Sequence, residues 1–275
     1  MNRQDLEEIE ITVLLEAIFQ RYGYDFRQYA RASLRRRVRN ILNRTNLGTV
    51  SELIPRVLRD KNFFADIIAE FSITVTEMFR DPGYFRSLRE NVVPYLKTYP
   101  YVKVWHAGCA TGEEVYSTAI LLEEEQFLDR VTFFATDFNG AALEKAEQGI
   151  YPLERIQKYT ANYQAAGGKG SFGDYYHAAH DSVIFAGSLK RNITFADHNL
   201  ATDDVFSEMH FISCRNVLIY FDRNLQNRVL TLFCNSLVHG GILALGSKES
   251  LRFSSVQNKF EPIDPKWKIY RKTTV

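Results

Sequence analysis

The chain has 275 residues, of which 45% are hydrophobic and 24% are charged, and its formal net charge is +1. This length corresponds to one large domain or two small ones, and a core of this size folds without disulfides or metals. The near-neutral charge disfavours a nucleic-acid-binding protein, and no apolar run approaches the roughly 20 residues that a membrane-spanning helix needs.

The N-terminal residues and the cysteines give no targeting or cross-linking signal. The first eight residues are polar and acidic, unlike a secretory signal. Cys109, Cys214 and Cys234 are widely spaced and form no C-x-x-C pair. We therefore expect a cytoplasmic protein without a disulfide framework, without direct membrane insertion and, by default, monomeric.

Residues 5–80 have a helical pattern. Leu34, Val38, Ile41 and Leu42 follow i, i+4, i+7, i+8 spacing, which places them on one apolar stripe of a helix. Further helices are predicted over Val13–Tyr22, Val50–Leu58 and Phe63–Phe71. We assign residues 1–82 to an all-helical domain.

The first 60 residues contain eleven arginines and no lysine, and six of these arginines lie between Arg31 and Arg44. The apolar stripe leaves four of them on the opposite face of the helix: Arg35, Arg36, Arg37 and Arg39. This basic face is either a docking surface for an acidic partner or a solvated helix face.

Beyond Asp81-Pro82, short apolar runs alternate with amphipathic segments, which predicts a parallel α/β sheet with helices on both faces over residues 83–275. The expected strands and helices follow in order: Val102–Ala107, Glu114–Glu124, Val131–Thr136, Ala141–Gln148, Ile193–Ala196, Phe211–Cys214, Leu225–Leu237 and Ile242–Leu245. Phe260–Ile263 and Trp267–Arg271 predict a terminal hairpin. Residues 158–193 are rich in glycine and aromatic residues and form either a small inserted β subdomain or a mobile loop.

The strand Val102–Ala107 leads into a turn that carries Gly108 and Gly112, and a helix that begins with Glu113 and Glu114. Glycines let a backbone approach a ligand closely. The spacing G-x-x-x-G fits neither a dinucleotide fingerprint nor a P-loop, and two carboxylates at a helix start would repel phosphate. The turn therefore favours a sulfonium nucleoside as ligand, with a purely structural strand–helix turn as the alternative.

Polar residues follow the later strands. Asp137 ends the second strand, where it could accept hydrogen bonds from ribose hydroxyls or cap the next helix. Arg215 and Asn216 end another strand, and Asn199 and Leu200 follow a third. Ligands bind outside the carboxyl ends of strands in open α/β sheets, so these residues are expected to line one crevice.

At these residues the chain resembles the CheR family of chemoreceptor glutamate methyltransferases, from about Phe71 to Arg271. The motifs that carry the resemblance are Thr74-Val-Thr76-Glu-Met-Phe79-Arg80-Asp81, Ala107-Gly-Cys-Ala-Thr-Gly-Glu-Glu114, Ala135-Thr-Asp137, Gly149-Ile-Tyr151, Asn199-Leu200, Cys214-Arg-Asn-Val-Leu-Ile-Tyr-Phe-Asp222 and Gly240-Gly-Ile-Leu-Ala-Leu-Gly246. The resemblance implies a helical domain, a doubly wound Rossmann-like class I methyltransferase sheet with a small inserted β subdomain, and S-adenosylmethionine as methyl donor, with S-adenosylhomocysteine as product. It implies the cytoplasmic domains of transmembrane chemoreceptors as partners.

The resemblance also assigns residues to the donor site: Thr74, Thr76, Arg80, Gly108, Glu113, Asp137, Asn199, Leu200, Arg215 and Asn216. Thr74 stands where the family often has Asn, and Gly246-Ser-Lys-Glu-Ser250 departs from the usual Gly-His-Ser-Glu. Residues 167–186 form a longer segment than in enteric members of the family.

A glutamate acceptor is ionised at neutral pH and needs no general base. Arg80 and Tyr220 are candidates for orienting it, although Tyr220 could instead pack within Val217–Phe221. His177 and His180 are interpreted as part of a polar loop and not as a metal site. Two alternatives remain: a methyltransferase with another protein or small-molecule acceptor, and a non-catalytic adaptor that binds the donor or its product.

Overall fold

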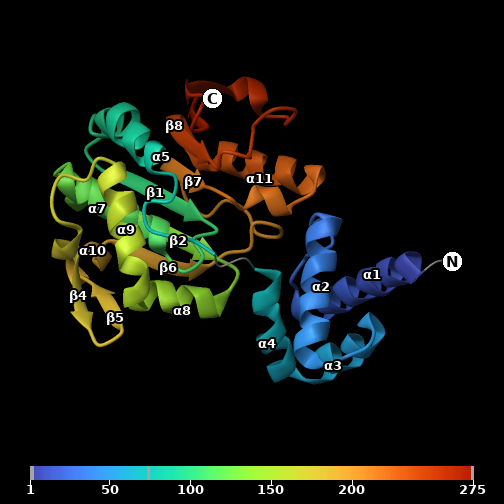
Figure 1. Ribbon diagram of the computed structural model, residues 1–275. Helices are drawn as coiled ribbons and strands as arrows, with labels where there is room; N and C mark the ends of the chain where they lie inside the picture. Colours follow the sequence, from blue (N-terminus) through green and yellow to red (C-terminus); the bar gives the residue numbers. More distant parts are fainter. Residues whose placement is uncertain (1–2, 73–74, 274–275) are drawn as a thin grey trace.

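The computed structural model describes residues 3–72 and 75–273. The N-terminal part is helical, as predicted (Figure 1). Its helices are α1 (Arg3–Tyr22), α2 (Arg31–Thr45), α3 (Leu53–Arg59), which follows a 3-10 turn at Val50–Glu52, and α4 (Lys61–Phe71). The Asp60 carboxylate accepts the backbone N–H groups of Asn62 and Phe63, both at 3.0 Å, and so fixes the start of α4.

The rest of the chain is built on a seven-stranded sheet in the order β6-β2-β1-β7-β8-β10-β9. The strands are β1 (Val102–Ala107), β2 (Val131–Asp137), β6 (Ile193–Asp197), β7 (Met209–Cys214), β8 (Leu237–Leu245), β9 (Phe260–Asp264) and β10 (Ile269–Lys272). The pairs from β6 through β8 are parallel, whereas β10 is antiparallel to both β8 and β9. The predicted doubly wound sheet and terminal hairpin are confirmed.

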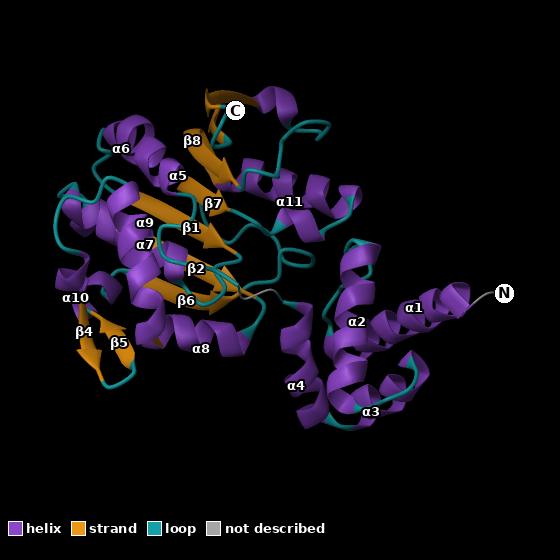
Figure 2. Ribbon diagram, in the orientation of Figure 1, coloured by secondary structure: helices purple, strands orange, loops and turns teal. Residues whose placement is uncertain are grey.

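Helices cover both faces of this sheet (Figure 2). They are α5 (Pro82–Ser87), which continues through a π turn at Leu88–Val92 into α6 (Val93–Leu96), then α7 (Glu113–Glu124), α8 (Gly140–Gln148), α9 (Ile156–Ala165), α10 (Gly187–Lys190) and α11 (Arg223–Ser236). Short 3-10 turns at Leu128–Arg130, Leu153–Arg155, Phe172–Tyr175, Leu218–Tyr220 and Gln257–Lys259 connect the remaining elements.

A small antiparallel sheet has the order β3-β5-β4, with β3 (Ile150–Pro152), β4 (Tyr176–Ala179) and β5 (Ser182–Phe185). The structure therefore contains the β subdomain and not a plain loop, but β3 precedes the expected range 158–193 and α9 occupies its beginning. Figure 1 shows β4 and β5 on the side of the molecule opposite to the helical domain.

Two apolar cores lie on opposite faces of the large sheet. One contains Val104 of β1 and the buried residues of α5 to α7, and the other contains Trp105 of β1, the residues of α11 and the whole core of the helical domain. The second core is continuous between the domains: the rings of Tyr29 and Phe221 are 4.9 Å apart. Backbone bonds of 2.8 Å, from Ala30 N–H to the Tyr220 carbonyl and from Asp222 N–H to the Gln28 carbonyl, fix the same contact.

This interface sets the position of the helical domain. The arrowheads of β1, β2, β6 and β7 point toward α2 and α4 in Figure 2, so the helical domain faces the carboxyl ends of the parallel strands. None of the described helices is both long enough and apolar enough to cross a membrane.

Candidate functional site

A cleft of about 980 Å³, counting its open mouth, lies where the helical domain meets the carboxyl ends of the strands. Most residues predicted from the sequence line it: Thr76, Arg80, Gly108, Asp137, Asn199, Leu200, Arg215, Asn216 and Tyr220. Thr74 lies outside the described residues. The cleft thus gathers segments that are far apart in the sequence, as expected for strand ends in a doubly wound sheet.

The turn after β1 needs its glycine. Gly108 has φ +75°, and a Cβ there would lie 2.5 Å from Cγ2 of Val217. The N–H groups of Gly108 and Cys109 donate to the Thr136 carbonyl at 2.8 and 2.9 Å, which holds the turn against the end of β2. The backbone can therefore pass close to the cleft without a side chain in the way.

Asp137 is buried at the end of β2, and its two carboxylate oxygens accept N–H groups from Ala110 (2.9 Å) and Asn139 (3.0 Å). Asn139, and not Asp137, caps α8 by accepting from Ala142 N–H. Burial raises the pKa of Asp137 while these backbone bonds lower it. Each oxygen keeps a lone pair for a ligand hydroxyl, which is the chemistry expected of a ribose-binding acid.

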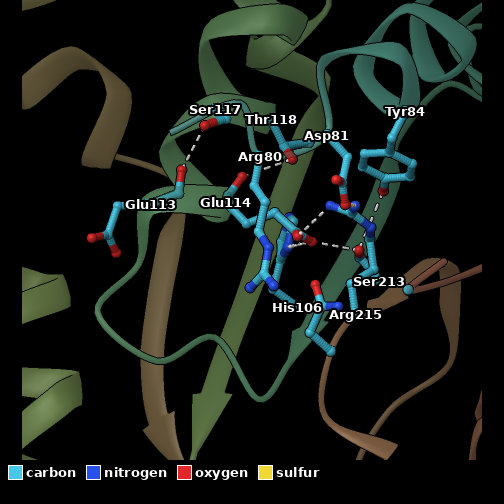
Figure 3. A network of polar contacts seen from close by, with 12 residues as sticks. Arg80, Asp81, Tyr84, His106, Glu113, Glu114, Ser117, Thr118, Ser213 and Arg215 are labelled. Atoms are coloured by element: carbon cyan, nitrogen blue, oxygen red, sulfur yellow. Dashed lines mark hydrogen bonds and ion pairs between the residues drawn. The ribbon is translucent and has the colours of Figure 1, made fainter. Parts of the chain in front are cut away.

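Glu113, which was predicted to contact the ligand, does not line the cleft. Its side chain is buried outside the cleft, where it accepts from Thr111 Oγ1 at 2.6 Å and from Tyr159 OH at 3.4 Å. Glu114, the next residue, lines the cleft instead. Successive helical residues point about 100° apart, so only one acid of the pair can face the cleft; Figure 3 shows the two pointing in different directions.

Glu114 belongs to a buried ionic network around Arg215 (Figure 3). The Arg215 guanidinium donates to Glu114 Oε2 at 2.9 Å and to Asp81 Oδ2 at 2.6 Å, and it lies 3.8 Å from the centre of the Tyr84 ring. Burial by itself would raise the pKa of Glu114, but the contacts with Arg215 and His106 outweigh this effect and lower the pKa to about 2. The guanidinium of Arg215 is thus used within the protein.

Arg80 occupies a strained turn. Phe79 and Asp81, on either side of it, have φ values of +51° and +59°, although neither is glycine. Phe79 N–H donates to Ser117 Oγ at 2.8 Å, and Asp81 is held by Arg215. Among the described residues, the Arg80 side chain makes a single hydrogen bond, of 3.4 Å, to the Val75 carbonyl, so most of its guanidinium donors remain available in the cleft.

Glu249 is a residue of the site that the sequence interpretation missed. It is buried and accepts backbone N–H groups of the turn after β7, from Asn216 (3.1 Å), Val217 (2.8 Å) and Ile219 (3.3 Å), and from Gly246 (2.5 Å). Asn216 has φ +62°. The carboxylate holds this turn in place against the cleft. The sequence feature that could have identified Glu249 is that it is the one acid in Gly246-Ser-Lys-Glu-Ser250.

Arg37 requires a correction. It was expected on the exposed face of α2, but its exposed fraction is 3%, it lines the cleft, and its guanidinium lies 5.0 Å from the centre of the Tyr220 ring. Its Nε, Nη1 and Nη2 atoms are buried without a hydrogen-bond partner among the described residues. Burial lowers the pKa of Arg37. A buried cation without a partner is costly, so this residue indicates a ligand anion.

Part of the cleft lining is apolar. Leu200 is buried beside the cleft, and Phe138 and Val217 also line it. Asn199 accepts Ala201 N–H at 3.0 Å and so shapes the turn after β6. This part of the lining is suited to a flat, weakly polar ring. Within the described ranges, no group of three or more His, Cys, Asp and Glu residues is arranged to hold a metal ion.

A glycine turn after the first strand, an acid ending the next strand and a cleft outside the strand ends together define the class of α/β proteins that bind a nucleoside-containing ligand. Comparison with known proteins narrows this class. Residues 9–72 match the family model described as the all-alpha domain of CheR methyltransferase, and residues 74–269 match its SAM binding domain. The chain therefore belongs to the CheR methyltransferase family and is an S-adenosylmethionine-dependent methyltransferase.

Relatives agree with this assignment. The chain is 51% identical to the putative methyltransferase Cher3 of Pseudomonas putida, over 97% of both chains. It is 27% identical to a chemotaxis protein methyltransferase of Listeria monocytogenes, over 83% of this chain and 85% of the relative. A chemotaxis protein methyltransferase of Vibrio parahaemolyticus is 29% identical over 87% and 86%.

The cleft fits S-adenosylmethionine. Asp137 offers acceptors for ribose hydroxyls, Leu200 and Phe138 offer apolar surface for adenine, and Gly108 leaves room beside the backbone. When bound, the donor supplies a methyl group activated by a positively charged sulfur. The turn after β1 has no phosphate-binding glycine loop, which matches a ligand without phosphate.

Replacing Asp137 with alanine is expected to weaken binding of both S-adenosylmethionine and S-adenosylhomocysteine by about 10–100-fold, because hydrogen bonds to a charged group contribute about 1.5–3 kcal/mol each. Titration calorimetry of both ligands measures this loss. Asp197→Ala, at the end of the neighbouring strand β6 and outside the cleft lining, is the matched control. Unchanged affinity in a folded Asp137→Ala protein would contradict the assignment.

Asp81→Asn is expected to loosen the Arg80 turn and to weaken S-adenosylhomocysteine binding by about 5–10-fold, since it removes one charged partner of Arg215. If Asp81 acts through Arg80, the same substitution has no further effect in an Arg80→Ala protein. A double-mutant cycle on affinity tests this coupling. Additive losses would show that Asp81 does not act by positioning Arg80.

The pKa of Glu114, lowered from 4.5 to about 2, makes its ion pair stabilising above pH 4.5 and progressively less so as the pH falls toward 2. The difference in free energy of unfolding between the native protein and Glu114→Gln should therefore shrink across that window. Urea unfolding at stepped pH measures it. A difference that stays constant down to pH 2 would contradict the shift.

Proposed function

We propose that the protein transfers the methyl group of S-adenosylmethionine to glutamate side chains of chemoreceptors and so forms glutamate methyl esters. The observation that supports this acceptor is Arg37, a buried guanidinium that lines the donor cleft and has no hydrogen-bond partner among the described residues. A carboxylate is the natural partner of such a group, since it matches guanidinium geometry and offsets the cost of its burial.

The acceptor site consists of residues from both domains. Arg37 of α2 approaches the cleft from the helical domain, Arg80 from the linker, and Tyr220 from the turn after β7. The ring of Tyr220 faces the Arg37 guanidinium at 5.0 Å, which restricts both side chains. Two cations in one cleft favour an anionic acceptor over a neutral amine or a hydroxyl.

The chemistry needs positioning more than proton transfer. A glutamate with a reference pKa near 4.3 is ionised at neutral pH, so its oxygen is nucleophilic without a base. Arg37 and Arg80 would hold the carboxylate and limit its orientations, and the cleft walls would exclude water from it. Receptors that bear these glutamates on cytoplasmic domains place the enzyme in the cytoplasm.

The test is a transfer assay with methyl-labelled donor and membranes that contain a chemoreceptor. Label that enters the receptor and is released as methanol by mild alkali identifies a carboxyl ester, because methylated amines are stable to alkali. A receptor whose candidate glutamates are replaced by alanine is the control. Alkali-stable label, or transfer only to small molecules, would contradict the proposal.

Arg37→Met is expected to lower kcat/KM for the protein acceptor by about 10–100-fold, on the scale of a charged hydrogen bond, with donor affinity within about twofold. The same substitution should leave the protein equally or more stable, because it removes an unpaired buried charge. Arg36→Met, on the exposed neighbour, is the matched control. Unchanged transfer by Arg37→Met, or a stability loss that accounts for its inactivity, would argue against acceptor binding.

A further inference from the structure

The basic face of α2 is largely neutralised within the helical domain. Arg35 pairs with Glu8 at 2.5 Å, Arg39 with Glu7 at 2.8 Å and Arg44 with Glu70 at 2.9 Å. Arg37 is buried, so Arg36 is the member of the predicted docking set that stays exposed without an ion pair in the described structure. Long-range attraction of an acidic partner therefore has to come mostly from other cations.

Such cations line a second groove, between the start of α11 and the loop at residues 248–254. The groove encloses about 1020 Å³, counting its open side. Arg223, Lys248 and Arg252 line it, are exposed, and have no ion-pair partner among the described residues. The acid in its lining, Glu249, is buried and engaged by backbone N–H groups. The groove thus presents positive charge that no carboxylate of the described residues pairs with.

An aromatic side chain is exposed to solvent beside these charges. Phe253 is 84% exposed and has φ +67°. Its N–H donates to Gln257 Oε1 at 2.8 Å, and the Arg252 guanidinium lies 5.3 Å from the centre of its ring. An exposed aromatic in a strained backbone conformation beside cations is typical of a binding anchor.

The groove and the catalytic cleft share one turn. Leu218 and Ile219 line the groove, whereas Val217 and Tyr220 of the same turn line the cleft. Glu249 fixes this turn by accepting hydrogen bonds from the N–H groups of Val217 and Ile219. A segment seated in the groove therefore contacts the same turn that lines the cleft.

We infer that this groove, formed by Arg223, Lys248, Arg252 and Phe253, docks an acidic segment of the acceptor protein and presents its glutamate to the cleft. The inference rests on the proposed function for the identity of the acceptor. Charge complementarity selects an acidic partner, Phe253 supplies an apolar anchor, and continuity with the cleft gives docking a catalytic use.

Docking is tested apart from methylation with a fluorescein-labelled, alanine-based helical peptide that carries glutamates along one face. Fluorescence anisotropy compares it with the same peptide in which glutamine replaces glutamate. The variants are Lys248→Glu/Arg252→Glu and Phe253→Ala. The matched control is Lys61→Glu/Lys145→Glu, which reverses two exposed charges elsewhere on the surface. S-adenosylhomocysteine affinity, unchanged in every variant, shows that the proteins are folded.

The native protein should prefer the glutamate peptide, with affinity that falls as salt rises. The groove double variant should bind about 10-fold or more weakly and Phe253→Ala about 3–10-fold, while the control stays within about twofold. Equal binding of both peptides, or an equal loss in the control, would overturn the inference. Groove-dependent binding without transfer to receptors would count against the proposed function alone.

Discussion

The buried guanidinium of Arg215 is the constraint around which the site is organised. A cation at the end of β7 that is almost fully enclosed is tolerable only if anions meet it with good geometry. Glu114 comes from the start of α7 and Asp81 from the linker between the domains, while the Tyr84 ring covers one face of the guanidinium. This network of ion pairs therefore connects the end of β7, the start of α7 and the interdomain segment that carries Arg80.

A second carboxylate has a similar role with backbone donors. Glu249 gathers N–H groups from the turn after β7 and from Gly246, which keeps Val217 against the Gly108 turn. Glu114 and Glu249 both act at the carboxyl ends of strands. There the sheet leaves polar backbone groups without partners in a strand pair. The cleft is thus shaped by charged groups that the ligand does not need to touch.

The arrangement of the fold was predictable because it depends on periodicity. The alternating runs, the glycine turn and the apolar stripe of α2 are local patterns, and the structure confirms the sheet, the hairpin and the helical domain that they predicted. Element ends were less predictable because single side chains decide them: Asp264 accepts the N–H groups of Lys266 and Trp267 at 3.0 and 3.1 Å, so the last strand begins at Ile269 and not at Trp267. The strand β3 was missed because its short run pairs with β5, distant in sequence.

The site residues show the same limit more sharply. Glu113 was assigned to the donor site, whereas Glu114 lines the cleft. Spacing alone does not separate the two acids, because their orientation depends on Arg215 and Tyr159, which lie far along the chain. It also counted Arg37 with its neighbours, whereas α2 packs against Tyr220 and turns this one arginine inward. The functional division among the α2 arginines follows from their partners. Those facing α1 and α4 pair with carboxylates, whereas the one that lines the cleft has no hydrogen-bond partner among the described residues. Under the proposed function, its charge is left for the acceptor.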